Sequence, residues 1–179
     1  MALPKDYETP KKPSNYMRWE EGKNKFRILS DVIVGYEWWI ETPDGGRKPL
    51  RCRPEDAHKH DAPEGDLKHF WAMVVWNYDT ERIQILEITQ GSIQDELYGY
   101  ENNPDWGDLK NYDITVTRTG KKIFDTKYTV QPSPPKAADK GLLEAYKNMT
   151  INLEALYDGD DPFATEGDSS ADEAIKAGV

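Results

Sequence analysis

One stretch of the sequence, residues 69–88, constrains the fold more than any other. It reads HFWAMVVWNYDTERIQILEI, two apolar runs of ordinary strand length separated by the polar break at 79–82. Aromatic and β-branched residues dominate both runs, a composition typical of a β-hairpin. Because side chains alternate between the faces of a strand, both faces of the first run are largely apolar. One face carries Phe70, Ala72, Val74, Trp76 and Tyr78, and the other carries His69, Trp71, Met73, Val75 and Asn77. The stretch therefore predicts a central strand with little free surface.

Three further strands are predicted around this hairpin. Residues 25–40, KFRILSDVIVGYEWWI, form either one long strand or two strand halves bent at Gly35, since glycine inside a strand often marks a bend. Residues 111–119 and 123–131 form two more, joined by a turn at Gly120. In the first of these, Tyr112, Ile114 and Val116 are expected to point inward, and Asp113, Thr115 and Thr117 outward.

Two helices complete the predicted elements. Residues 89–102 carry apolar side chains at helical spacing, with Thr89 as the expected cap. A second helical pattern runs over residues 139–157, whereas residues 47–68 are polar and lack periodicity, as in a long functional loop. The order of elements is that of a mainly β, five-stranded OB-fold barrel with its helix between the third and fourth strands. An SH3-like barrel is the alternative, disfavoured by the position of the helix.

The expected organisation is one domain with accessory segments. Residues 1–15 form a proline-rich and lysine-containing arm, 16–135 the OB-fold domain, 136–157 a helical segment, and 158–179 an acidic, disordered tail. From Glu154 onward, eight acidic residues and one lysine account for −7 of the net charge of −10. The body is therefore close to neutral and has room for a local basic patch.

The sequence gives little support to a catalytic or metal-dependent function. It has no phosphate-binding glycine loop and no nucleophile elbow. Cys52, His58, His60 and His69 are zinc-ligand types within one region, but they lack the paired-thiolate spacing of structural sites, and solvated histidines beside a small buried thiol are the alternative. We therefore expect no enzyme activity, no cofactor and no metal. A single cysteine, no signal-peptide pattern and no membrane-spanning apolar run lead us to expect a soluble intracellular protein.

Interleaved aromatic and basic residues favour single-stranded nucleic acid as the ligand. Proteins that bind single-stranded nucleic acid hold its phosphates in a basic groove and stack its bases on aromatic rings. The candidate stacking residues are Tyr36, Trp38, Trp39, Trp71, Tyr78 and Trp106. The candidate phosphate contacts are Arg27, Arg47, Lys48, Arg51, Arg53, Lys68, Arg118, Lys121, Lys122 and Lys127. Because Trp38 and Trp39 are adjacent in a predicted strand, they point to opposite faces, and one of the two is expected to be exposed.

Four segments, RILSDVIVGYEWW, HFWAMVVWNYDTERIQILEITQ, NNPDWGDLKNYDITVTRTG and YTVQPSPP, resemble the OB-fold single-stranded DNA-binding proteins of tailed bacteriophages. The resemblance covers roughly residues 15–135, and PDWGDLKNYDI is its most specific part. It implies a replication and recombination accessory protein that coats single-stranded DNA in the cytoplasm of the infected bacterium. It also implies an acidic C-terminus that recruits partner proteins.

The tail contains a motif that is compared with the Asp-Asp-x-Pro-Phe tips of bacterial single-strand binders. Here Asp160, Asp161, Pro162 and Phe163 lie internally, with sixteen residues after them. We expect this motif to recruit partners, or the tail to compete with DNA for the basic groove. The alternative function is a protein-interaction or scaffold module of the replication machinery without direct DNA binding; RNA binding is a third possibility.

Overall fold

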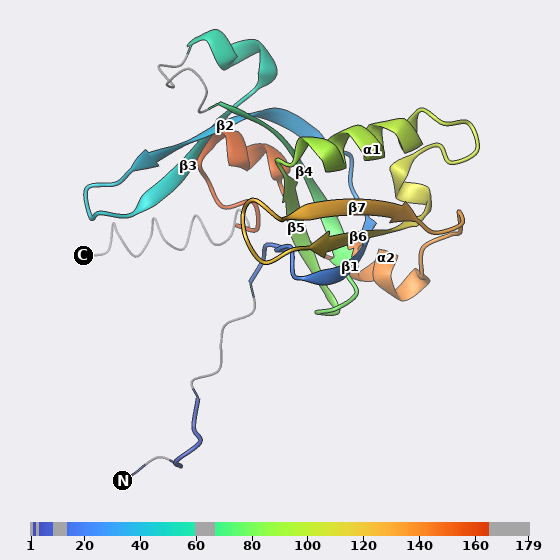
Figure 1. Ribbon diagram of the computed structural model, residues 1–179, viewed down its shortest axis with the longest axis horizontal. Coiled ribbons are helices and arrows are strands. Elements are labelled where there is room, and N and C mark those ends of the chain that lie inside the picture. The colour runs from blue at the N-terminus through green and yellow to red at the C-terminus, as the bar shows by residue number, and fades with distance from the viewer. Residues whose placement is uncertain (1, 3, 9–13, 60–66, 165–179) are drawn as a thin grey trace.

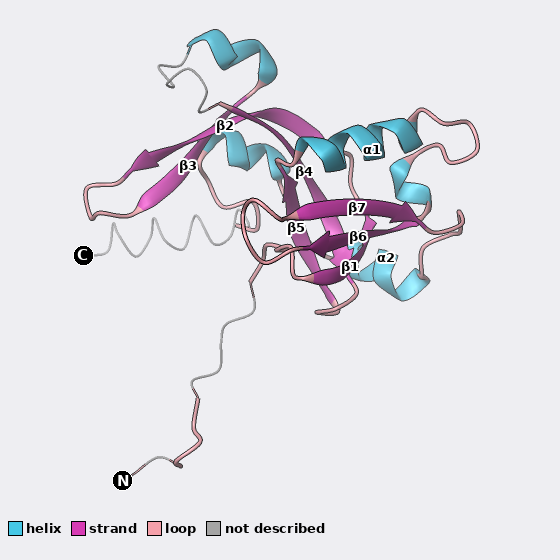
Figure 2. Ribbon diagram, viewed as in Figure 1, coloured by secondary structure: helices cyan, strands magenta, loops and turns pink. Residues whose placement is uncertain are grey.

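The strand β4 (Lys68–Asn77) lies at the centre of the fold, as its apolar faces predict (Figure 1). We describe residues 2, 4–8, 14–59 and 67–164 of a computed structural model. Its seven strands form one antiparallel sheet in the order β3-β2-β4-β1-β6-β7, with β5 paired to β4 (Figure 2). The strands besides β4 are β1 (Gly22–Ile28), β2 (Ile33–Glu41), β3 (Arg47–Cys52), β5 (Arg82–Ile88), β6 (Asp113–Thr119) and β7 (Lys127–Pro132).

Helices are few and short, so the protein is mainly β. They are α1 (Gly91–Glu101), α2 (Lys140–Lys147) and the 3-10 turns η1 (Pro54–Lys59), η2 (Leu109–Asn111) and η3 (Leu153–Asp158). Among the described residues, no helix is both long enough and apolar enough to span a membrane. The prediction of a mainly β fold is confirmed, but the sheet has seven strands rather than five.

Residues 25–40 form two strands that share one edge of β4, which agrees with the alternative of two strand halves rather than one long strand. β1 pairs with the C-terminal part of β4, Phe26 opposite Asn77, and β2 pairs with the N-terminal part, Ile33 opposite Ala72. The chain bends between them at residues 29–32, where the Leu29 N–H donates to the Val74 carbonyl at 2.9 Å. The bend is therefore not at Gly35, and that prediction was wrong.

Gly35 instead lies inside β2 because another part of the chain approaches it closely. A Cβ atom at this position would lie 2.3 Å from the Cys52 carbonyl oxygen and 2.9 Å from the Phe70 ring. Only glycine leaves room for this contact. The glycine signal in the sequence was real, but it reports close packing between backbones rather than a change of direction.

The prediction of a loop over residues 47–68 was wrong in its first part. Residues 47–52, RKPLRC, form β3, which pairs with β2 along its whole length, and η1 follows. The segment was missed because it is basic, contains Pro49 and lacks an apolar alternation. Proline is tolerated there because β3 lies at the edge of the sheet.

Two apolar clusters lie on opposite sides of β4 and β5. The first, between the sheet and α1, contains Phe26, Ile28, Met73, Val75, Leu86, Ile88, Ile93, Leu97, Tyr112, Ile114 and Val116 among its buried residues. The second contains Phe70, Ala72, Val74, Ile83, Ile85, Leu153 and Leu156. The alternation predicted for residues 69–78 thus matches the two clusters. The second face of β4 and β5 is covered by residues of the C-terminal segment rather than left open.

The helix α1 confirms the predicted apolar spacing but not the predicted cap. Ile93 and Leu97 are fully buried against the sheet. The N-cap residue is Gln90, whose side chain makes no capping hydrogen bond, so Thr89 is not the cap. The Gln90 side chain instead accepts a hydrogen bond from the Trp19 indole N–H at 3.2 Å, which ties the helix start to the N-terminal segment.

β6 keeps the predicted inward face, but one of its outward residues is buried. Tyr112, Ile114 and Val116 are fully buried, as expected. Asp113, predicted to face solvent, is also fully buried because it accepts hydrogen bonds from neighbouring side chains. Its partner β7 begins at Lys127 rather than at Ile123, so residues 120–126 form a longer loop than predicted.

The C-terminal part of the chain is folded onto the sheet in two short pieces. The predicted single helix over 139–157 is divided into α2 and η3 by residues 148–152. The residues that follow η3 also pack on the domain: Pro162 is buried, and its carbonyl accepts a hydrogen bond from the Asn152 N–H at 2.8 Å. The prediction of disorder from Asp158 was therefore wrong for 158–164, and residues 165–179 lie outside the described part.

Candidate nucleic-acid interface

The loop between β6 and β7 presents two large apolar side chains to solvent. Ile123 is 92% exposed and Phe124 is 98% exposed, and both follow the exposed Lys121 and Lys122. Sequence reasoning placed Ile123 and Phe124 in a strand and so missed them as candidates. The signal was available in the charge pattern, since KKIF follows a Gly turn and precedes Asp125.

This loop is held in a defined turn by its own backbone. Gly120 has φ +91°, and a Cβ there would lie 2.2 Å from the Asp125 carbonyl oxygen, so glycine is required. The Lys122 carbonyl accepts hydrogen bonds from the Asp125 N–H at 3.0 Å and from the Thr126 hydroxyl at 2.8 Å. These bonds close the loop and leave Phe124 at its outside.

The outer face of β1, β6 and β7 carries lysines and hydroxyls. Lys23 lies opposite Thr117 and Lys25 opposite Thr115, so these side chains share one face. The face continues onto β7 with Thr129, opposite Thr117. Lys23 and Thr129 are exposed, and so is Lys127 at the start of β7, next to the loop. The surface can therefore donate hydrogen bonds and place positive charge along the sheet.

A buried cluster around Asp113 anchors this face. The Asp113 carboxylate accepts a hydrogen bond from the Tyr78 hydroxyl at 2.8 Å and lies 3.4 Å from the Arg27 guanidinium. Lys25 and Lys136 lie 3.7 and 3.6 Å from its second oxygen. Three cations thus surround one carboxylate, which leaves a net positive charge. The side chains of Lys25 and Lys136 are partly exposed, so this charge lies at the surface.

Arg27 and Tyr78, both predicted to contact DNA, instead form hydrogen bonds within the protein. The other Arg27 donors reach the Lys110 carbonyl at 2.9 Å and the Lys136 carbonyl at 2.8 Å, and the residue is almost fully buried. Burial, followed by the hydrogen bond to Asp113, raises the pKa of Tyr78 to about 12. The prediction that Arg27 contacts a phosphate does not fit this placement.

The β2–β3 hairpin places an exposed aromatic beside basic residues. Trp38 is buried and Trp39 is 47% exposed, so the prediction that one of this adjacent pair is exposed is confirmed. The Arg47 guanidinium lies 6.0 Å from the centre of the Trp39 ring, within cation–π range. Lys48 is exposed on β3, and Tyr36 packs against the His69 ring with centroids 5.4 Å apart.

Arg51 and Arg53 on this hairpin contact the protein itself. Arg51 binds the Glu87 carboxylate through two donors, at 2.8 and 3.2 Å, and lies 3.5 Å from Glu37. Arg53 lies over the Tyr157 ring at 4.5 Å and beside Glu154 at 3.7 Å. Both arginines therefore connect the hairpin to neighbouring structure, Arg51 to β5 and Arg53 to η3.

Glu37 has an ionisation behaviour opposite to that of a surface carboxylate. It is 5% exposed, and one of its oxygens has no hydrogen-bond partner. Burial, followed by hydrogen bonding with the Glu87 carboxylate, raises the pKa of Glu37 to about 8. The charge of Arg51 opposes this shift. Arg51 also binds the Glu87 carboxylate, and the pKa of Glu87 is lowered.

Replacing Glu37 with glutamine is expected to raise thermal stability at high pH. The pKa of Glu37 in the folded protein, about 8, lies above the ordinary glutamate pKa of 4.5, so the native protein loses stability as pH rises from 4.5 towards 8. Glutamine removes this loss, and Glu37→Gln should exceed the wild type in melting temperature at pH 9 by several degrees more than at pH 5. Glu41→Gln, an exposed change on the same strand, is the control. Parallel pH profiles for Glu37→Gln and wild type would contradict the assignment.

The remaining predicted nucleic-acid contacts lie at scattered places. Trp106 packs edge-on against Tyr100 and Tyr112, with centroids 5.7 and 5.6 Å away. Arg118 donates to the Trp19 carbonyl at 3.1 Å. Of the other predicted residues, Lys68 is exposed at the start of β4, while Trp71 is half-buried. Of the predicted contacts, the structure thus gathers Lys121, Lys122 and Lys127 at the β6–β7 loop and Trp39, Arg47 and Lys48 on the β2–β3 hairpin.

The four residues of zinc-ligand type noted in the sequence do not converge where they can be placed. Cys52 is buried at the end of β3, His58 is exposed on η1, and the His69 ring packs on Tyr36. His60 lies outside the described residues. Within the described ranges, no group of three or more His, Cys, Asp or Glu side chains is arranged to hold a metal ion.

The DDPF motif is docked on the domain. The Phe163 ring meets the Tyr16 ring edge-on at 6.5 Å and packs against the second cluster. Asp161 caps the turn, its carboxylate accepting a hydrogen bond from the Phe163 N–H at 2.9 Å. Because Pro162 is buried and Phe163 is half-buried, the apolar part of the motif stabilises the fold and does not extend into solvent.

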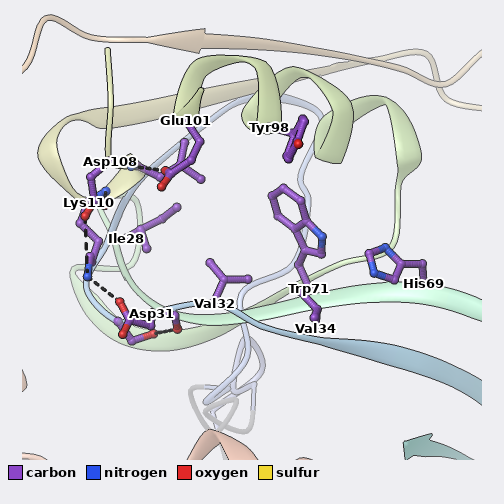
Figure 3. Close-up of a pocket in the computed structure, with 12 residues that line it drawn as sticks. Ile28, Asp31, Val32, Val34, His69, Trp71, Tyr98, Glu101, Asp108 and Lys110 are labelled. Carbon is purple, nitrogen blue, oxygen red and sulfur yellow. Dashed lines mark hydrogen bonds and ion pairs between the residues drawn. The ribbon is translucent and has the colours of Figure 1, made fainter. Parts of the chain in front are cut away.

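A cavity of about 460 Å³ lies between α1, β4 and the bend that joins β1 to β2. Figure 3 shows Trp71 from β4 and Tyr98 from α1 directed into it from two sides. Its other apolar walls come from Ile28, Val32, Val34 and Leu109, and its rim carries Asp31, His69, Glu101, Asp108 and Lys110.

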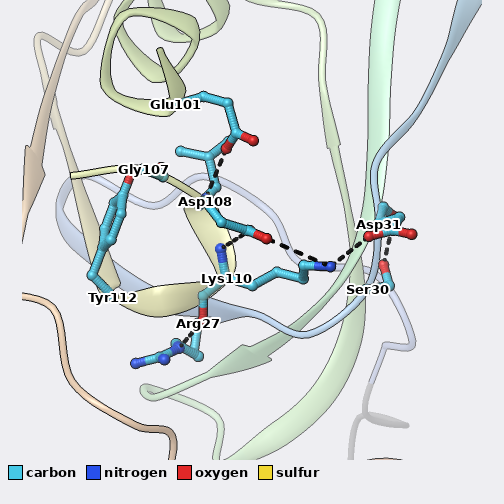
Figure 4. A network of polar contacts seen from close by, with 9 residues as sticks. Arg27, Ser30, Asp31, Glu101, Gly107, Asp108, Lys110 and Tyr112 are labelled. Carbon is cyan, nitrogen blue, oxygen red and sulfur yellow. Dashed lines mark hydrogen bonds and ion pairs between the residues drawn. The ribbon is translucent and has the colours of Figure 1, made fainter. Parts of the chain in front are cut away.

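The rim of this cavity is held by a polar network centred on Lys110 (Figure 4). The Lys110 ammonium lies 2.5 Å from Asp31 and 3.9 Å from Asp108. The hydrogen bond and charge of Lys110 lower the pKa of Asp31. Asp108 also accepts from the Lys110 backbone N–H at 2.8 Å, and Glu101 accepts from the Leu109 N–H at 2.8 Å. The network fixes the 101–110 segment against the bend after β1.

Comparison of the chain with protein-family models, with curated proteins and with solved structures finds no match in any of the three.

Proposed function

We propose that the protein binds single-stranded DNA without strong sequence preference, using the β6–β7 loop and the outer face of β1, β6 and β7. The observation that carries this proposal is the near-complete exposure of Phe124 beside Lys121 and Lys122. An aromatic ring that the fold leaves in water is available to stack on a base, and adjacent ammonium groups can bind the phosphates on either side. Stacking needs only the flat face that every base has, so such a site is tolerant of sequence.

The topology supports an OB-fold as the framework of this site. β1 and β2 are joined by a bend and both pair with β4, while on their other sides β1 pairs with β6 and β2 with β3. The helix α1 lies between β5 and β6 in the chain. In an OB-fold, the loop between the last two strands contacts nucleic acid, and the connection of β6 to β7 through residues 120–126 supports the same use here. The β2–β3 hairpin, with Trp39 and Arg47, lies in the connection between the first and second strands of such a barrel. In Figure 1 this hairpin and the β6–β7 loop lie towards the same side of the molecule.

The C-terminal segment limits the path that DNA takes on the sheet. Leu153, Leu156 and Phe163 cover the outer face of β4 and β5. Lys23, Lys25 and Lys127 lie on the outer face of β1, β6 and β7. The second cluster, which contains Leu153, Leu156 and Phe163, does not include this face. We therefore infer that the single-stranded DNA runs from the Phe124 loop along the outer face of β1, β6 and β7.

This activity fits a role in phage DNA replication or recombination, in the cytoplasm of an infected bacterium. Partner proteins would be recruited through the acidic C-terminal residues. Since Pro162 and Phe163 are packed on the domain, recruitment by the tail falls to the residues after 164.

Replacing Phe124 with alanine is the direct test. Oligo(dT) should quench tryptophan fluorescence of the wild-type protein, with affinity falling steeply as salt rises. Phe124→Ala should weaken oligo(dT) binding by roughly 5- to 150-fold, because one stacked base contributes about 1–3 kcal/mol. The melting temperature should stay unchanged, since Phe124 is 98% exposed.

Tyr98→Ala, an exposed aromatic on α1, is the matched control and should bind oligo(dT) normally. Equal loss in both variants would argue against a specific stacking site. No quenching by oligo(dT) at low salt would reject DNA binding and favour a protein-interaction module. Tighter binding of oligo(rU) than oligo(dT) at equal length would reassign the ligand to RNA.

A further inference from the structure

The cavity beside α1 combines apolar walls with exposed apolar residues at its mouth. Trp71, Val32 and Leu109 form its inner surface, and Val34 and Tyr98 stand at its opening. Tyr98 is 65% exposed although it faces this cavity. A volume of about 460 Å³ accommodates one or two large side chains from another molecule.

The rim of the cavity is anionic. Asp31, Glu101 and Asp108 surround the opening, and Lys110 is the one lysine among its lining residues. Lys110 lies closest to Asp31, which leaves the charges of Glu101 and Asp108 less compensated. The neighbouring helix adds to this field, because α1 contains three acidic residues and no basic residue. His69 also lines the cavity, and its ring nitrogen lies 3.4 Å from the Gln94 side chain.

We propose that this cavity docks a segment of a partner protein in which a bulky apolar side chain is flanked by lysine or arginine. The apolar side chain enters between Trp71 and Tyr98, and the flanking cations face the acidic rim. This interaction is separate from DNA binding and goes beyond it.

Charge disfavours two other occupants, single-stranded DNA and the acidic C-terminal residues of the chain itself. The phosphates of single-stranded DNA would meet the rim carboxylates at short range. The chain's own residues 165–179 carry four acidic residues and one lysine, so the same repulsion applies to them. The pocket is also separated from the proposed DNA site, since Lys110 precedes the start of β6 and the Phe124 loop follows its end. The two sites can therefore be occupied together.

Three synthetic peptides test the proposal against the full chain by fluorescence anisotropy. They are KKFLKK, its acidic counterpart EEFLEE, and its small-residue counterpart KKAAKK, in which both Phe and Leu are replaced by Ala. We expect KKFLKK alone to bind. Tyr98→Ala should weaken its binding at least about tenfold, through loss of the aromatic wall, and Glu101→Gln should weaken it by about threefold, through loss of a less compensated rim charge.

Phe124→Ala is the matched control: it should leave peptide binding unchanged while weakening oligo(dT), the reverse of Tyr98→Ala. Failure of one site is thus distinguished from failure of the other. Equal binding of the acidic or small-residue peptide, or unchanged binding of KKFLKK to Tyr98→Ala, would overturn the proposal. Self-association of the wild type that disappears in Tyr98→Ala would overturn it in favour of a second copy of this chain.

Discussion

Replacing Asp113 with alanine is expected to lower the free energy of unfolding by about 3–5 kcal/mol, the usual effect of removing one partner of a buried ion pair. Asp113 is fully buried, with 0% of its surface exposed, and Arg27 beside it is 2% exposed. Without the carboxylate, the Arg27 guanidinium and the Tyr78 hydroxyl lose a common acceptor. Urea unfolding at pH 7, monitored by tryptophan fluorescence, measures the change.

Two further variants separate the charge of Asp113 from its packing. Thr115→Ala, on the same strand and face, is the control and should change stability by much less. Arg27→Met combined with Asp113→Ala should be more stable than Asp113→Ala alone, because the uncompensated buried cation is gone. If Asp113→Ala unfolds within 1 kcal/mol of the wild type, roughly the range of an exposed pair, the cluster is not a structural anchor.

Reversing the charges of Lys121 and Lys122 together is expected to weaken DNA binding strongly and to lower its dependence on salt. Each lysine that neutralises a phosphate contributes about 0.7 to the slope of log affinity against log salt for single strands. Lys121→Glu/Lys122→Glu should therefore reduce this slope by about 1.4 and weaken oligo(dT) binding by tens of fold at low salt. Both side chains are exposed, so the melting temperature should change little.

The matched control is Lys140→Glu/Lys147→Glu on α2, which changes the net charge by the same amount. Both of these lysines are exposed. If binding depends on the position of the charge, this control should keep most of its affinity. Equal losses in the two double variants would show that only the overall charge matters, and a normal salt slope in Lys121→Glu/Lys122→Glu would place the phosphates elsewhere.

The sequence predicted the centre of the fold well because the pattern there is local. Alternating apolar residues over 69–78 and 112–116 report which side chains point inward, and burial enforces that pattern wherever a strand has two covered faces. The helix α1 was equally clear from Ile93 and Leu97. Adjacent Trp38 and Trp39 also had to face opposite ways, and the structure confirms that one is buried and the other exposed.

Other features failed because they depend on contacts between distant segments. β3 has no apolar pattern of its own and forms because β2 offers it an edge. Asp113 reads as an outward residue, yet Arg27, Tyr78 and two lysines from elsewhere in the chain make its burial favourable. The same applies to the DDPF motif, whose charges suggested a free tail until Tyr16 and the face of β4 and β5 provided a surface for Phe163.

The candidate sites divide in the same way. Residue types alone selected Lys121 and Lys122, but they also selected Arg27, Arg51 and Arg53, because a basic residue in a sequence does not reveal its partner. Phe124 was hidden by the opposite error, since an apolar residue near a strand pattern is assigned to the core. Periodicity and composition determined that this chain forms a mainly β sheet around residues 69–88. Only the tertiary structure decided which charges are neutralised by neighbours and which aromatic rings remain in water, because pairing and burial depend on segments far apart in the chain.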